Sequence, residues 1–192
     1  MLFVALRIYW PKVSIQAGAV AVVALALQAG AIFVPLGADD VPKKLLFQTS
    51  YLLLIFFVAA NWRRIGILII GVGLLLNFAA IISNGGLMPV TPEAYARIGE
   101  SQKVEGLEPG DAITNQKEIL KSRETTHLYF LTDRIVRDNP VVPIFSIGDI
   151  IAAVGLIVTL ADLLLPRVTR VPRDGGPAEA KPPGGGTSRG AA

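Results

Sequence analysis

The sequence contains no cysteine and a single histidine among its 192 residues. Without cysteine the chain can form no disulfide, no thiolate metal site and no cysteine nucleophile. Charged residues make up only 17%, against roughly a quarter in a typical soluble domain, whereas 52% of the residues are hydrophobic. No Gly-rich phosphate loop, nucleophile elbow or Walker motif is present. These features indicate a chain with a lipid-facing surface and no recognisable catalytic motif.

The hydrophobic residues are gathered into four long runs, at residues 13–36, 42–60, 65–83 and 147–165. The third run has no charged side chain, and as a helix it would extend roughly 28 Å, about the thickness of a bilayer's hydrocarbon core. Each run is therefore predicted to be a transmembrane helix. A signal peptide is the alternative for the first run, but this run is longer than the usual apolar signal core.

The predicted fold is an all-α, polytopic membrane protein with four transmembrane helices and a helical insert between the third and the fourth. The chain divides into five segments. They are a short N-terminus at residues 1–12, three helices at 13–83, a polar insert at 84–143, the fourth helix at 144–165 and a basic tail at 166–192. The tail is rich in proline and glycine, a composition typical of disorder.

The basic residues at the ends of the apolar runs predict the orientation in the membrane, because cytoplasmic segments carry an excess of lysine and arginine. One side would hold seven of them: Arg7, Lys12, Arg63, Arg64, Arg167, Arg170 and Arg173. The other side would hold Lys43 and Lys44, diluted by Asp39 and Asp40. Both termini are therefore expected in the cytoplasm of a bacterial cell and the insert outside. The basic character reflects these flanks, so no nucleic acid is expected as a partner.

Three helices are predicted within the insert. Thr91-Pro92-Glu93 has the residue types of a helix start, so a short helix is expected at residues 91–98. Asp111 could cap a second helix that reaches residue 123. Leu128, Leu131 and Ile135 then recur at helical spacing, which predicts a third helix with one apolar face.

Polar residues from distant parts of the sequence should meet at one membrane face. The third helix ends at Asn84 and the fourth begins near Asp149, so the insert that joins them must fold over that face. Gly85 and Gly86 permit a tight turn and a close approach of another group. The candidate functional cluster comprises seven residues: Asn84, Gly85, Gly86, His127, Asp133, Arg134 and Asp149.

Each ionisable member of the cluster has a functional and a structural interpretation. Asp149 could bind a ligand or exchange protons, or it could cap the fourth helix together with Ser146. His127 could be a general base or a metal ligand, or an interfacial residue hydrogen-bonded to the turn. Asp133 and Arg134 could anchor an anionic headgroup, or form a local salt bridge that folds the insert. A lone histidine without HExxH or paired spacing predicts no metal site, and no cofactor is expected.

Three stretches of the sequence resemble a family of bacterial membrane proteins known as the domain of unknown function 5317. They are Asn84-Gly85-Gly86-Leu87-Met88-Pro89, then His127-Leu128 with Leu131-Thr132-Asp133-Arg134, and Phe145-Ser146-Ile147-Gly148-Asp149. The resemblance extends over about residues 13–165. It implies a bacterial inner-membrane protein and implies no chemistry.

The favoured function is that of a non-enzymatic membrane component that binds a lipid or a partner protein at the outer face. One alternative is an enzyme that acts there on a lipid-linked or small substrate through His127, Asp133 and Asp149. Another is a subunit of an oligomeric transporter, although no carboxylate lies near the middle of any span, as proton-coupled transport usually requires. The expected partners are the lipid bilayer, and either another membrane protein or further copies of the chain.

Overall fold

The computed structural model describes residues 6–9, 14–34, 40–136 and 144–170. The chain forms two compact units. In the smaller one, β1 (Leu6–Tyr9) pairs antiparallel with β6 (Arg167–Arg170). The predicted disordered tail is therefore wrong for residues 167–170, which form a strand, while residues 171–192 and most of the predicted N-terminal segment lie outside the described residues.

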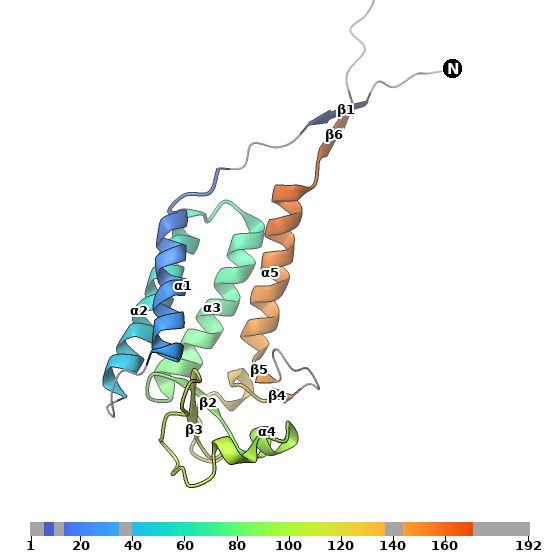
Figure 1. Ribbon diagram of the computed structural model, residues 1–192. Helices are drawn as coiled ribbons and strands as arrows, with labels where there is room; N and C mark the ends of the chain where they lie inside the picture. The colour runs from blue at the N-terminus through green and yellow to red at the C-terminus, as the bar shows by residue number, and fades with distance from the viewer. Residues whose placement is uncertain (1–5, 10–13, 35–39, 137–143, 171–192) are drawn as a thin grey trace, which may run out of the picture. The chain divides into compact units, whose positions relative to one another are not determined.

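The larger unit, Lys12–Leu164, contains four long helices side by side and the insert at one end (Figure 1). The helices are α1 (Gly18–Phe33), α2 (Val41–Ala60), α3 (Ile65–Ser83) and α5 (Ile147–Leu164). In the described part of the chain, α2, α3 and α5 are long and apolar enough to cross a membrane, whereas α1 is apolar but has 16 residues. The predicted bounds of α2, α3 and α5 agree with the structure to within one residue, and α1 is shorter than predicted.

Large apolar side chains point outward from these helices. Val22 in α1 is 67% exposed, Phe56 in α2 57% and Ile157 in α5 66%. In water such an apolar surface would be costly, whereas lipid tails cover it at no cost. The helical part of the molecule is thus compatible with a membrane protein.

The most extensive helix interface, between α3 and α5, is made possible by glycines. Gly66 and Gly73 lie seven residues apart on α3, and Gly148 and Gly155 lie seven apart on α5. A Cβ atom at Gly155 would lie 2.5 Å from the Ile70 nitrogen. The two backbones therefore approach more closely than any larger residue allows, as helices commonly do in membranes.

The insert is not helical throughout, so the all-α prediction is wrong there. Its described residues, 84–136, contain one α-helix, two 3-10 helices and three short strands. They are β2 (Met88–Val90), α4 (Pro92–Arg97), η1 (Ser101–Lys103), β3 (Glu118–Leu120), η2 (Tyr129–Leu131) and β4 (Ile135–Val136). β2 and β3 pair in parallel, and β4 pairs antiparallel with β5 (Ile144–Phe145), just before α5.

Backbone conformation explains the difference. Only the first predicted helix, now α4, is present. Asn115 has a φ of 56° and Leu128 a φ of 52°, which is left-handed backbone that cannot continue a right-handed helix. After Asn115 the chain forms β3, whose backbone groups are satisfied by pairing with β2. After Leu128 it forms the single 3-10 turn η2 and then β4, which pairs with β5. The helical spacing of Leu128, Leu131 and Ile135 is therefore accidental.

One apolar core joins the helix ends to the insert. It combines residues of α1, α2 and α3 with residues of the insert: Ala31, Phe47, Tyr51, Ala80, Ile81, Leu87, Met88, Ile119 and Leu131. A second core, built around Tyr95 and Ile113, lies within the insert. The insert is therefore fixed to the helix ends and places its polar residues there.

We expect Gly73→Ala to destabilise the larger unit, because its Cβ would lie 2.7 Å from the Ala152 nitrogen and the helices would have to separate. Overpacking of this kind costs about 1–3 kcal/mol. Gly30→Ala in α1 is the matched control, because no atom lies within 4 Å of its added Cβ. Thermal unfolding of the detergent-purified proteins should show a lower midpoint for the Gly73 variant alone. Equal midpoints for both variants would contradict the close approach of α3 and α5.

Candidate functional site

A polar cluster lies where the insert meets the ends of α3 and α5. Its members are Asn77 on α3, Ser146 and Asp149 at the start of α5, and Lys117 and Asp133 from the insert. Ser146 and Asp133 have 0% and 1% of their surface exposed, and Asn77 2%. Buried polar groups require partners, and these residues are one another's partners.

Asp149 caps α5 in the way predicted from the sequence. Its backbone N–H donates to Ser146 Oγ at 3.0 Å, and its Oδ2 accepts from the Ser146 backbone N–H at 2.9 Å. This reciprocal arrangement is a capping box. Asn77 ties the cap to α3, because its Nδ2 donates to Asp149 Oδ1 at 2.8 Å and its Oδ1 accepts from Ser146 Oγ at 2.8 Å.

Lys117 connects the insert to this cap. Its Nζ lies 3.0 Å from Asp133 Oδ2 and 3.5 Å from Asp149 Oδ2. The side chains of Lys117 and Asp149 are 26% and 34% exposed, whereas that of Asp133 is 0% exposed. One cation therefore joins two carboxylates, one buried and one at the edge of solvent. The two Asp133 carboxylate oxygens accept no hydrogen bond from the described residues. The ion pair with Lys117 therefore compensates for the burial of this carboxylate.

The burial of this group changes its protonation. Burial raises the pKa of Asp133 from 3.8 to about 7; Lys117 opposes the rise, and the negative charges of Asp149 and Glu118 add to it. Burial alone would lower the pKa of Lys117, but the carboxylates of Asp133 and Asp149 outweigh it and raise that pKa well above its usual value. Lys117 is thus a cation near neutral pH, and Asp133 is the group that exchanges a proton in that range.

Asn84 and His127 also come together, but through the His127 backbone. Asn84 Nδ2 donates to the carbonyl oxygens of His127 at 2.7 Å and Ala80 at 2.8 Å, and its Oδ1 accepts from the His127 N–H at 2.9 Å. The imidazole itself is exposed. In the described chain no hydrogen bond or ion pair joins that imidazole to Asp133 or Asp149, so these three predicted residues do not form one catalytic group.

Gly85 and Gly86 form the turn that leaves α3. Their φ angles are 96° and 100°, a region that favours glycine. A Cβ atom at Gly86 would collide with the Gln48 amide and lie 3.3 Å from Lys44 Cβ. The predicted turn and close approach are both present, and the approaching group is the first part of α2.

Arg134 faces away from the cluster. Adjacent residues in extended backbone point to opposite sides, so Asp133 enters the interior while Arg134 remains exposed. The predicted local salt bridge between them is wrong, because Asp133 pairs with Lys117. The Arg134 guanidinium instead lies 5.7 Å from the centre of the Tyr129 ring.

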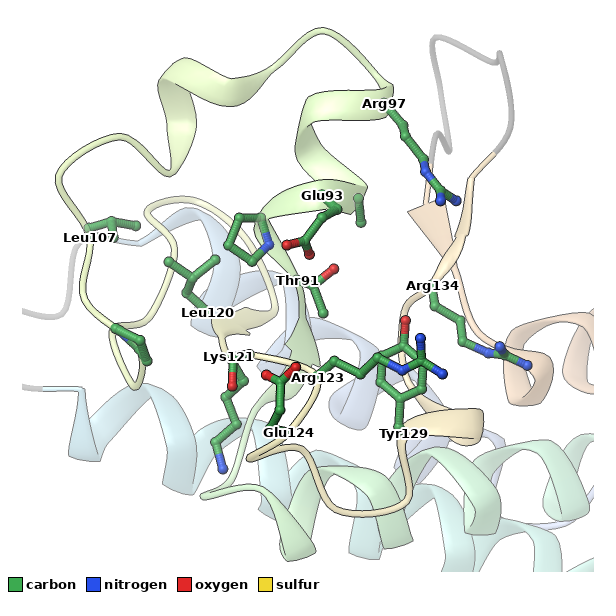
Figure 2. A pocket seen from close by; sticks show the side chains of 14 residues that line it. Thr91, Glu93, Arg97, Leu107, Leu120, Lys121, Arg123, Glu124, Tyr129 and Arg134 are labelled. Carbon is green, nitrogen blue, oxygen red and sulfur yellow. The ribbon is translucent and has the colours of Figure 1, made fainter.

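Arg134 lines a groove of about 460 Å³ on the outside of the insert (Figure 2). The groove lies between α4, η2 and the segment that follows β3. Two more basic than acidic side chains line it; the basic ones are Arg97, Lys121, Arg123 and Arg134, and the acidic ones Glu93 and Glu124. The groove thus gathers charged side chains that are available to a ligand.

Sequence reasoning missed Lys117, Glu118 and Tyr95. Lys117 fell within the second predicted helix, which is absent from the structure. Glu118 is 6% exposed and accepts a 3.3 Å hydrogen bond from Tyr95 Oη, and burial raises the pKa of Tyr95.

No metal ligands gather here. Among the residues that the structure describes, no three His, Cys, Asp or Glu side chains come together in a way that could hold a metal ion. The position between Asp133 and Asp149 is filled by the Lys117 ammonium group.

We expect Asp133→Asn to remove a pH dependence of stability. Because folding raises this pKa, the contribution of Asp133 to stability is complete below about pH 4 and is lost as the pH rises through about 7. Asparagine does not ionise, so the variant does not lose stability in this way as the pH rises. Its free energy of unfolding relative to the wild type should therefore improve by about 2 kcal/mol or more between pH 5 and pH 8.

Thermal unfolding in detergent across this pH range measures the difference. Glu105→Gln is the control, because Glu105 is an exposed carboxylate of the same insert, and its difference curve should stay flat. A flat curve for Asp133→Asn as well would mean that Asp133 is ionised and paired throughout.

Comparison with known proteins supports the resemblance seen in the sequence. The family profile described as "Family of unknown function (DUF5317)" matches residues 12–161, which include α1, α2, α3, most of α5 and the polar cluster. No curated protein and no solved structure matches the chain. The protein therefore belongs to the DUF5317 family.

Proposed function

We propose that the protein is a multi-pass component of a bacterial cytoplasmic membrane that binds a lipid or a partner protein at the outer face and catalyses no reaction. In this proposal α1, α2, α3 and α5 are its four spans, and both termini are cytoplasmic. The apolar outer surface of the helices supports the membrane location. α1 is included because apolar sequence continues on both sides of its 16 residues.

One observation carries the proposal: the ionisable groups of the cluster hold the insert in place. Lys117, Asp133 and Asp149 are paired with one another, and Asp149 also caps α5. A catalytic acid or base needs access to a substrate, whereas Asp133 has none. The groove, by contrast, is lined by polar side chains that a ligand can reach.

The orientation can be tested with single cysteines, since the chain has none of its own. Thr114→Cys places a thiol on an exposed loop of the insert, and Trp62→Cys places one in the turn between α2 and α3, where Trp62 is 59% exposed. A membrane-impermeant maleimide added to intact cells should label the first thiol, and the second only after lysis. The reverse pattern would invert the orientation and make cytoplasmic molecules the candidate ligands.

Ligand binding without turnover can be tested by native mass spectrometry of the protein released from its membrane in mild detergent. We expect a phospholipid bound at a stoichiometry of about one and chemically unchanged. A co-purifying protein in its place would identify the partner alternative, and a converted lipid would identify an enzyme.

His127→Ala belongs in the same experiment. It should leave the fold and the bound lipid unchanged, because Asn84 holds the backbone of His127 and not its imidazole. Asn84→Ala is the matched change, since it leaves those two backbone groups without their partner, which costs about 1–3 kcal/mol. Loss of ligand from a folded His127 variant would contradict the structural role of this residue.

A further inference from the structure

The groove has the charge distribution of an anion site. Its strongest feature is a pair of guanidinium groups on one aromatic ring: Arg123 lies 5.1 Å and Arg134 5.7 Å from the centre of the Tyr129 ring. Contact with an aromatic ring does not neutralise a guanidinium charge. Within the described residues, no carboxylate lies within ion-pair distance of Arg97, Arg123 or Arg134, so their donors are available to a ligand.

An exposed apolar pair lies in the same segment as Tyr129, at the ends of the helices. Within the described insert, Leu128 at 40% and Phe130 at 55% are the only exposed large hydrophobic residues. They flank Tyr129 in the sequence, and η2 contacts both α3 and α5. Aromatic and apolar side chains in this position are typical of the zone between headgroups and tails. A soluble ligand would gain nothing from this pair, whereas the chains of a lipid would cover it.

The carboxylates of the groove add a second element of recognition. Figure 2 shows Glu93 and Glu124 between the arginine side of the groove and its apolar side, where Leu107 and Leu120 lie. Beside a bound phosphate they would accept hydrogen bonds from hydroxyl or ammonium groups of the same ligand. Glycerol and ethanolamine headgroups have such donors, and choline has none.

We propose that this groove binds the phosphodiester headgroup of a membrane phospholipid, with the phosphate on Arg123 and Arg134 and the hydroxyl or ammonium donors on Glu93 and Glu124. This inference rests on the proposed function and assigns it a site and a ligand class. Guanidinium groups suit the task because they bind phosphate oxygens through two parallel hydrogen bonds. The Lys117 cluster takes no part in binding and keeps the groove at the level of the helix ends.

The test compares the full-length protein with Arg123→Gln/Arg134→Gln in micelles that contain equal amounts of phosphatidylglycerol and phosphatidylcholine. Native mass spectrometry measures the ratio of the two lipids retained. We expect the wild type to prefer phosphatidylglycerol and the double variant to lose at least about tenfold in this ratio, since two charge-assisted hydrogen-bonding groups are removed. Both arginines are exposed, so the lipid-free thermal midpoint should not change.

Arg63→Gln is the matched control. Arg63 also lies over an aromatic ring, 5.1 Å from the centre of Trp62, but in the turn between α2 and α3. This variant should retain the wild-type lipid ratio. An equal loss in both variants would mean that general charge, and not the groove, attracts the lipid, and would overturn the assignment.

The remaining outcomes separate this inference from the proposed function. If the double variant keeps the wild-type preference, the groove assignment fails while lipid binding stands. If the wild type retains no lipid, the lipid-binding form of the proposed function fails as well. A soluble phosphate ligand has its own signature: inorganic phosphate alone would then stabilise the delipidated wild type as strongly as phosphatidylglycerol does, in a way that depends on Arg123 and Arg134. That result would overturn the assignment of a lipid as the ligand of the groove.

Discussion

The position of the insert depends on one ion-pair arrangement, in which Lys117 lies between Asp133 and Asp149. A buried carboxylate without a cation is strongly destabilising, so Asp133 can occupy the interior only while Lys117 is beside it. Lys117 in turn reaches α5 through Asp149, and Asp149 reaches α3 through Asn77. Two helices and two segments of the insert are thereby linked. The glycine contacts between α3 and α5 begin at this cluster, where a Cβ atom at Gly148 would collide with the Asn77 amide. They bring the helix ends close enough for the cluster to form.

The same device recurs at both ends of the helices: an asparagine holds a distant peptide by its N–H and its C=O. Asn84 binds the His127 peptide in this way, with distances of 2.9 and 2.7 Å. Asn61 at the end of α2 binds the Gln16 peptide, with distances of 2.9 and 2.8 Å. An asparagine amide has one acceptor and one donor group side by side, which matches the two groups of a peptide. Both residues therefore have a structural task that explains their burial without any ligand.

The sequence predicted the features that depend on local pattern. The apolar runs specified α2, α3 and α5, and the spacing of Ser146 and Asp149 specified the cap of α5. The meeting of Asn84 with His127 followed from topology alone. The strands of the insert could not be predicted, because three residues such as 88–90 show no periodicity and acquire their conformation from a partner 30 residues away. The role of Lys117 could not be predicted for the same reason. The position of Lys117 depends on the strand with which β3 pairs and not on the residues next to Lys117 in the sequence.

The alternation at Asp133 and Arg134 separates the two kinds of charge in this molecule. The Asp133 side chain is buried in the ion pair with Lys117, whereas the Arg134 side chain is exposed in the groove. The same short backbone segment fixes the positions of both. A bridge to Val90 holds that segment against β2, and the turn at Leu128 directs Tyr129 towards the arginines. A change that loosens Asp133 would therefore also displace Arg134 and the ring beneath it. The buried ion pair and the exposed groove thus depend on the same backbone segment. A mutation in the cluster could therefore abolish ligand binding by displacing the groove, and this loss alone would not identify a catalytic residue. Substitutions of side chains that line the groove are the informative ones.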